Sequence, residues 1–115
     1  MNDKVYKMKF SKVYPLYIQK IERKGRTKAE LDIVIQWLTG YSEQELRTQL
    51  NSDADFGAFF ANAPQINPNA NKITGAICGI RVEEITEPLM QKIRWMDKLV
   101  DELAKGKTTE KILRD

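Results

Sequence analysis

The sequence contains no histidine and a single cysteine among its 115 residues. Without histidine the chain lacks the usual general base near neutral pH, the Ser-His and Cys-His nucleophile pairs, and the commonest zinc ligand. The lone Cys78 excludes an internal disulfide and is typical of a protein from a reducing compartment. We therefore expect no metal and no cofactor, and the missing histidines favour a protein that is not an enzyme.

Long apolar runs are also missing. No segment approaches the roughly 20 apolar residues that a membrane-spanning helix needs. The lysines of residues 1–7 are not followed by an apolar stretch, so we expect no signal peptide. With 42% hydrophobic and 30% charged residues, the composition is that of an ordinary globular protein. We expect one cytoplasmic domain that spans residues 1–115.

Positive charge is concentrated in the first quarter of the chain. Residues 1–26 hold eight Lys and Arg against two acidic residues, a net charge of +6, whereas the remainder has a net charge of −3. Such a segment could contact the phosphates of a nucleic acid. The candidate nucleic-acid contacts are Lys12, Lys20, Arg23, Lys24 and Arg26. The alternative is a solvated face that balances the acidic remainder.

Helical periodicity dominates most of the sequence. Capping boxes, in which Ser or Thr precedes Glu by three residues, begin at Thr27 and Ser42. Pro15 and Pro88 suit the first turn of two further helices. The predicted helices cover residues 15–24, 27–39, 42–50, a short segment at 56–63, 88–104 and 108–114. We therefore predict a mainly α fold of five or six amphipathic helices.

Two segments favour extended structure. Residues 5–10 alternate apolar and basic side chains, and we expect residues 1–12 to form an edge strand or a basic arm. Residues 73–82 are apolar and β-branched but contain two glycines, so a strand and a helix turn both remain open. If both segments are strands, they would form a minor two-stranded element.

The predicted helix at 88–104 carries a candidate interface. Its apolar residues alternate spacings of four and three, which is the pattern of a coiled-coil seam. The seam consists of Leu89, Ile93, Met96, Val100 and Leu103. It could form a homodimer interface, and packing inside its own domain is the alternative. The leading hypothesis for function is therefore a non-enzymatic binding or interaction module.

The segment at 73–82 is the candidate site for a small ligand. Glycines let a backbone approach a ligand closely, and Arg81 could bind a carboxylate or a phosphate. The candidate ligand-binding residues are Thr74, Gly75, Gly79, Arg81, Asn67 and Asn69. An anion binder or an enzyme at this site is an alternative function. The structural alternative is a core element in which Arg81 pairs with Glu83 or Glu84.

Three further features favour structural explanations. The predicted helices on either side of Gly40 suggest a helix-turn-helix, but the second is rich in acidic residues, which repel phosphate. Asp97 and Asp101 lie on one helical face, where ion pairs with neighbouring Lys and Arg explain them better than a metal does. Cys78 has no basic neighbour in sequence and is predicted to be a buried, unreactive thiol.

Four ordered motifs resemble a known family. They are Lys-Gly-Arg-Thr at 24–27, Trp-Leu-Thr-Gly-Tyr at 37–41, Ile-Thr-Gly-Ala-Ile-Cys-Gly-Ile-Arg-Val-Glu at 73–83 and Asp-Lys-Leu-Val-Asp-Glu-Leu-Ala-Lys-Gly at 97–106. With these motifs the chain resembles a family of small bacterial proteins called domain of unknown function, number 2200. The resemblance covers nearly the whole chain and implies a bacterial origin and a stand-alone domain. It implies no catalytic residue.

Overall fold

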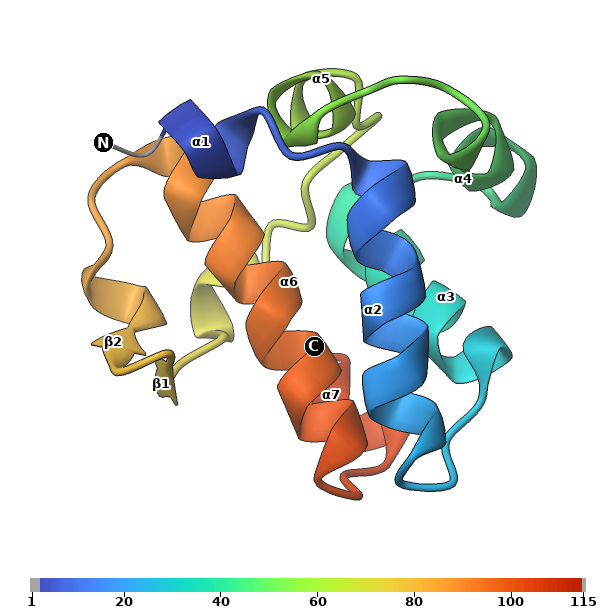
Figure 1. Ribbon diagram of the computed structural model, residues 1–115. Coiled ribbons are helices and arrows are strands. Elements are labelled where there is room, and N and C mark those ends of the chain that lie inside the picture. The colour runs from blue at the N-terminus through green and yellow to red at the C-terminus, as the bar shows by residue number, and fades with distance from the viewer. Residues whose placement is uncertain (1–2, 115) are drawn as a thin grey trace.

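The computed structural model describes residues 3–114 and is mainly helical (Figure 1). The α-helices are α1 (Asp3–Tyr6), α2 (Phe10–Glu22), α3 (Lys28–Thr39), α4 (Glu43–Leu50), α5 (Phe56–Ala61), α6 (Pro88–Ala104) and α7 (Thr109–Ile112). The other elements are the 3-10 turns η1 (Ala70–Lys72) and η2 (Val82–Glu84) and the strands β1 (Ala76–Ile77) and β2 (Ile80–Arg81). The mainly α prediction is confirmed, and the additional helix in the described part of the chain is α1.

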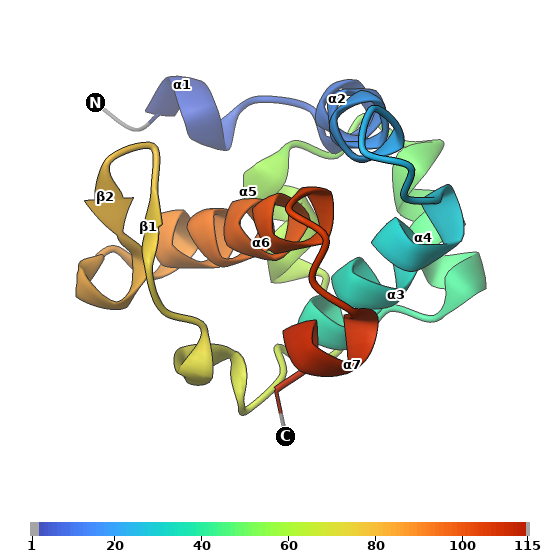
Figure 2. The same cartoon turned by 90° about the horizontal axis from the view of Figure 1, so that it is seen from below.

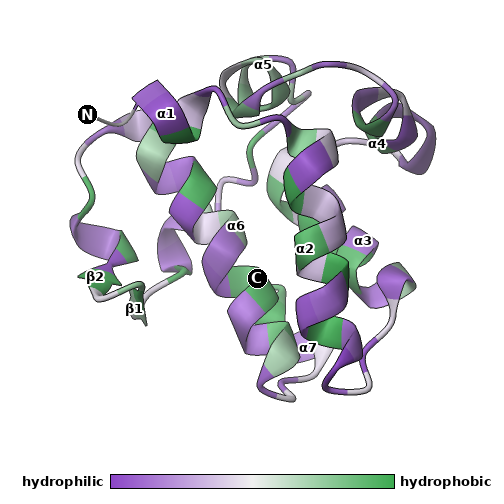
Figure 3. Ribbon diagram, in the orientation of Figure 1, coloured by the Kyte–Doolittle hydropathy of each residue, from purple (hydrophilic) through white to green (hydrophobic). Residues whose placement is uncertain are grey.

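Helices α2, α3 and α6 pack around the hydrophobic core, with α5 closing one end (Figures 1 and 2). The stripe predicted on α3 is fully buried: Leu31, Val34, Ile35 and Leu38. At the start of α2, Phe10 stacks on Phe59 of α5 with 3.9 Å between the ring centroids. In Figure 3 the long helices carry apolar and polar residues side by side, as helices with one buried face do.

The N-terminal segment is not the edge strand predicted for residues 5–10. Its start lies in α1, and Phe10 already belongs to α2. Residues 8–10 instead make an isolated bridge with residues 54–56. Two backbone hydrogen bonds form it, from Phe10 N to the Ala54 carbonyl and from Phe56 N to the Met8 carbonyl, each at 3.0 Å. Short, isolated pairing of this kind fixes the entry to α2 without building a sheet.

Pro15 does not begin a helix, because α2 starts five residues earlier. Proline lacks the N–H that would bond the carbonyl four residues back, here that of Ser11. Pro15 is exposed, so the missing hydrogen bond lies on the side of α2 that faces water. This position makes a proline inside the helix tolerable. The burial of Phe10 and Val13, rather than the proline, decides where α2 begins.

Residues 73–82 contain a hairpin that pairs with itself, and not with residues 5–10. Ala76 lies opposite Arg81, and Ile77 lies opposite Ile80. The turn residues Cys78 and Gly79 have φ angles of +54° and +78°, as a two-residue type I′ turn requires. Such a turn places its two central residues at the tip of the hairpin. Cys78 is accordingly exposed, and the prediction of a buried thiol was wrong.

Two loops of similar sequence lie side by side at the end of the molecule where α2 and α6 terminate, the lower end in Figure 1. Lys-Gly-Arg-Thr at 24–27 joins α2 to α3, and Lys-Gly-Lys-Thr at 105–108 joins α6 to α7. Gly25 and Gly106 both take positive φ angles, +77° and +94°. The threonine of each loop then caps the helix that follows. Similar local sequences therefore build the same helix stop and start twice.

Arg26 ties these two loops together. Its Nη1 donates to the carbonyls of Leu103 and Lys107, each at 2.8 Å. Its Nε and Nη2 donate to Glu30 at 3.1 and 2.7 Å. Hydrogen bonds from Arg26 and from the backbone N–H of Thr27 lower the pKa of Glu30 to about 2. Arg26 is therefore a structural residue that needs Glu30 ionised.

The Glu30→Gln substitution should lower the free energy of unfolding at pH 7 by about 1–2 kcal/mol. Because folding lowers the pKa of this carboxyl, its contribution is complete above the pKa in the unfolded chain and is lost as pH falls towards 2. The two proteins should therefore approach equal stability near pH 2. Urea unfolding at several pH values measures this. Glu45→Gln is the control, because Glu45 also closes a capping box but has no arginine partner, and it should cost less at pH 7.

Candidate functional site

The interface residues predicted on α6 lie in the core of the same chain. Met96 and Leu103 are 0% exposed and Ile93 and Val100 are 1% exposed, while Leu89 is partly buried. Helices α2, α3 and α5 cover this side of α6. This corrects the interface assignment: the seam packs inside its own domain. A partner could reach these side chains only if the fold opened.

The predicted ligand-binding residues do not converge on one site. Arg81 is exposed, and its guanidinium pairs with Glu83 at 3.2 Å. The side-chain oxygen of Asn67 accepts a hydrogen bond from the backbone N–H of Asn69, and the backbone N–H of Asn67 donates to the Leu38 carbonyl at the end of α3. The remaining candidates lie in or beside the hairpin: Thr74, Gly75 and Gly79. The asparagines therefore shape a loop that is anchored on α3, and Arg81 has the carboxylate partner expected of a structural residue.

The predicted nucleic-acid contacts are divided by the fold. Arg26 is held between the two loops, and Lys20 pairs with Asp101 at 3.3 Å. The others are exposed on or just after α2: Lys12, Arg23 and Lys24. Lys12 lies near the start of α2, whereas Arg23 and Lys24 follow its end. The five cations thus do not form one continuous basic surface.

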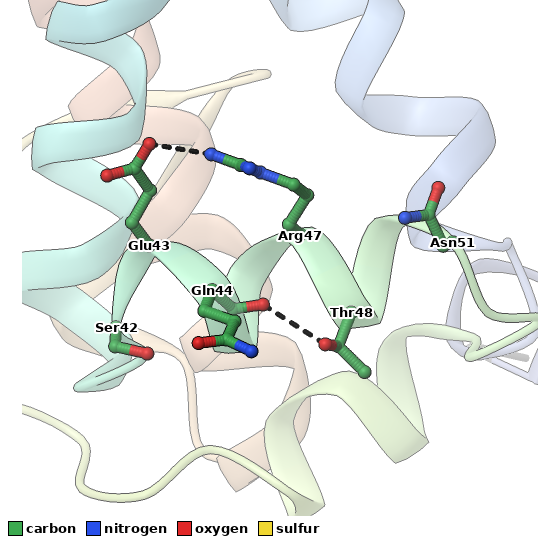
Figure 4. A pocket seen from close by; sticks show the side chains of 6 residues that line it. All are labelled: Ser42, Glu43, Gln44, Arg47, Thr48 and Asn51. Carbon is green, nitrogen blue, oxygen red and sulfur yellow. Dashed lines mark hydrogen bonds and ion pairs between the residues drawn. The ribbon is translucent and has the colours of Figure 1, made fainter.

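A hollow of about 640 Å³ follows one side of α4 (Figure 4). All of its lining residues come from this helix and its two caps. The lining side chains also bond to their own helix, since Arg47 pairs with Glu43 at 2.7 Å and Thr48 Oγ1 donates to the Gln44 carbonyl at 3.1 Å. A ligand here would touch one helix surface only. We therefore regard the hollow as the polar outer face of α4.

A pocket of about 280 Å³ lies where α1, α2 and α6 meet. Figure 2 shows α1 and α2 on the same side of α6. Its apolar lining consists of Val5, Met8, Val13, Phe56 and Ile93, and its polar lining of Tyr17, Arg94 and Asp97. We call it the Arg94 pocket. Ligand sites typically have such mostly apolar walls with a few polar groups.

The three polar side chains of the pocket form one hydrogen-bonded group. The Tyr17 hydroxyl donates to Asp97 Oδ1 at 2.5 Å, and Arg94 Nη1 donates to Asp97 Oδ2 at 2.9 Å. Burial, together with the negative charge of Asp97, raises the pKa of Tyr17 well above its ordinary value. The phenol therefore stays protonated at neutral pH. Each oxygen of Asp97 accepts one hydrogen bond from within the protein.

Arg94 is the member of this group with unused hydrogen-bonding capacity. Its buried Nε has no acceptor, and its Nη2 donates to no residue within 3–114. The side chain is 22% exposed and also borders a second hollow, of about 290 Å³, beside Ile80 and Glu87. A guanidinium has five N–H donors, and with Nη1 bonded to Asp97 and Nε enclosed, Nη2 is the group left to bond an acceptor that enters the pocket.

The second aspartate of α6 has a structural role. Asp101 pairs with Lys20 at 3.3 Å and with Lys105 at 3.0 Å, which confirms the ion pairing predicted for it. Burial alone would raise the pKa of Asp101, but hydrogen bonds from Lys105 and Lys20 outweigh it and leave the pKa below its ordinary value. Residues 3–114 contain no group of three His, Cys, Asp or Glu placed to hold a metal ion.

Comparison with known proteins settles the family. The model of a family described as uncharacterized protein conserved in bacteria (DUF2200) matches residues 4–114. The chain belongs to the DUF2200 family. The crystal structure of uncharacterized protein SP1917 is similar to it, with 50% sequence identity and a TM-score of 0.92 over 98% of this chain and 93% of that chain. No curated protein matches the chain.

Sequence reasoning missed the Arg94 pocket of this DUF2200 protein. For Asp97 we predicted ion pairs with neighbouring basic residues, and the pair with Arg94 confirms this. The prediction missed the hydrogen bond from Tyr17. Tyr17 and Asp97 are 80 residues apart, so no local pattern could join them. One signal was available: α2 carries a tyrosine among its apolar residues, and a buried tyrosine hydroxyl usually finds a polar partner.

No helix within residues 3–114 has the length and apolar character to cross a membrane.

Proposed function

We propose that this DUF2200 protein is a non-enzymatic binding module and that its ligand-binding site is the Arg94 pocket. The observation that carries the proposal is the guanidinium of Arg94, whose Nε and Nη2 have no acceptor although it lines an apolar pocket. The five apolar side chains supply contact area, and the arginine supplies orientation. The proposal keeps the interaction-module hypothesis and moves its site from the α6 seam to the neighbouring pocket, which shares only Ile93 with the seam.

The chemistry of the polar group favours binding over catalysis. A general base must be free to approach the proton it removes, and a nucleophile needs an activating base. Tyr17 is held protonated, and Asp97 accepts hydrogen bonds on both oxygens. Arg94 can only donate.

We place the protein in the cytoplasm, and the exposed free thiol of Cys78 supports this because such thiols persist in reducing compartments.

Screening a library of small fragments against the uniformly 15N-labelled protein tests the site. Amide chemical shifts should change for residues 5–17 and for residues near Arg94 on α6. The Met8→Trp variant should lose these changes, because a larger side chain on the pocket wall fills the space that the fragments need. The control is Leu16→Trp, which alters another exposed apolar residue that does not line the pocket.

Two results would contradict the proposal. Fragments could shift amides elsewhere, for example along α4, and leave the pocket silent. Alternatively, the pocket shifts could survive in Met8→Trp. Circular dichroism of both variants confirms beforehand that each remains folded.

A further inference from the structure

The N-terminal segment places a lysine directly before each apolar residue that it contributes to the Arg94 pocket. The pairs are Lys4–Val5, Lys7–Met8 and Lys12–Val13. Lys4 and Lys12 lie in helices, where consecutive residues point about 100° apart, and none of the three lysines lines the pocket itself. All three lysines are exposed, and their ammonium groups make no ion pair with residues 3–114. The apolar wall of the pocket is therefore bordered by unpaired positive charge.

The charges on the two sides of Arg94 are opposite in sign. The neighbouring hollow is bordered by Glu84 and Glu87, which would repel an anion. The Arg94 pocket has one carboxylate, Asp97, and both of its oxygens already accept hydrogen bonds. An anion is therefore attracted to the side of Arg94 that faces α1 and α2. Three lysines of the basic first quarter, Lys4, Lys7 and Lys12, therefore border the Arg94 pocket.

We infer that the Arg94 pocket binds a small amphipathic monoanion, a carboxylate that carries an apolar tail. This inference rests on the proposed function and names its ligand class. The tail packs against Val5, Met8, Val13, Phe56 and Ile93, and the carboxylate accepts hydrogen bonds from Arg94. A single guanidinium binds a single carboxylate well, because its parallel N–H groups match the two oxygens. At about 280 Å³ the pocket is at the small end of ligand sites, which suits a short tail.

Four probes separate the charge of the ligand from its tail. Octanoate has both features, 1-octanol has the tail alone, acetate has the carboxylate alone, and octylammonium has the opposite charge. Calorimetric titration into the full chain should give octanoate a dissociation constant at least about tenfold lower than that of 1-octanol, as one charge-assisted hydrogen bond provides. Acetate and octylammonium should bind more weakly than 1-octanol. The advantage of octanoate should shrink as salt rises, because the lysines act through solvent.

Variants assign the effect to the named residues. Arg94→Met should weaken octanoate about tenfold and leave 1-octanol unchanged. The matched control is Arg81→Met, which also removes an arginine paired with a nearby carboxylate but lies outside the pocket. The double variant Lys7→Gln with Lys12→Gln changes only exposed side chains, so it tests the charge even if Arg94→Met fails to fold. It should weaken octanoate several-fold at low salt only.

The outcomes separate this inference from the proposed function. Equal affinity for octanoate and 1-octanol, or tighter binding of octylammonium, would overturn the anion and leave a binding pocket. Octanoate binding that is unchanged in Arg94→Met and in the lysine double variant would overturn it as well. If no probe with a tail binds although fragments occupy the pocket, the ligand class is wrong. If fragments also avoid the pocket, the proposed function fails with it.

Discussion

Replacing Leu103 with lysine should abolish folding. Leu103 is fully buried in α6, where it belongs to the core that α2, α3 and α7 share with this helix. Truncating a buried leucine alone costs about 2–5 kcal/mol. Burying an ammonium without a partner adds several kcal/mol more. The sum approaches the total stability of a small domain, about 5–15 kcal/mol. Thermal unfolding followed by circular dichroism should show no cooperative transition.

The Leu16→Lys variant is the control for this experiment. Leu16 is 57% exposed on α2, so a lysine there stays in water and the unfolding midpoint should hardly change. A folded Leu103→Lys variant would contradict the placement of the α6 seam in the core. If Leu103→Lys gave a folded monomer from a dimeric wild-type protein, the seam would be a subunit interface after all. Analytical ultracentrifugation of both variants distinguishes these cases.

The Gly40→Ala substitution should cost about 2–4 kcal/mol, well above the cost of Gly25→Ala. Both glycines have a φ angle of +77°, so both substitutions carry the penalty of a left-handed backbone. A Cβ at Gly40 would come within 2.8 Å of the Gln65 carbonyl oxygen and 2.9 Å of its nitrogen. Backbone atoms cannot rotate away, so residues 64–66 must shift.

At Gly25 an added Cβ meets nothing within 4 Å. Gly25→Ala should therefore cost only about 1 kcal/mol, the left-handed penalty alone. Urea unfolding of both variants gives the difference, which isolates the contact between the end of α3 and residue 65. Equal losses would mean that this loop yields freely and that the close approach contributes nothing.

Local signals predicted the helices well. Thr27 and Ser42 form capping boxes with Glu30 and Glu45, as their spacing indicated. Pro88 begins α6 because proline fits a first turn, where no N–H is needed. Each of these features is decided within about four residues of sequence. The predicted start of α2 was wrong because it relied on the local signal of Pro15. A contact distant in sequence, Phe10 packing on Phe59, determines where this helix begins.

The candidate site was beyond such reasoning. The Arg94 pocket needs α1, α2, α5 and α6 together, and its central hydrogen bond joins residues 80 apart. Sequence patterns show that a helix has a polar and an apolar side, but they do not show which neighbour covers it. The seam on α6 illustrates this, because a heptad-like stripe is equally suited to a partner subunit and to the core. The exposed turn at Cys78 was missed because cysteine is an uncommon choice for a type I′ turn, where Asn and Gly prevail.

The contacts between α2 and α6 also bear on how the protein is made. Tyr17 reaches Asp97 across 80 residues, and Lys20 reaches Asp101 across 81. A ribosome releases the N-terminal segment of a chain first, at about 5–20 residues per second. The apolar side of α2 therefore waits several seconds, at this rate, before α6 emerges to cover it. The core can therefore close only after α6 has left the ribosome, and until then the nascent chain exposes the kind of apolar surface that chaperones bind.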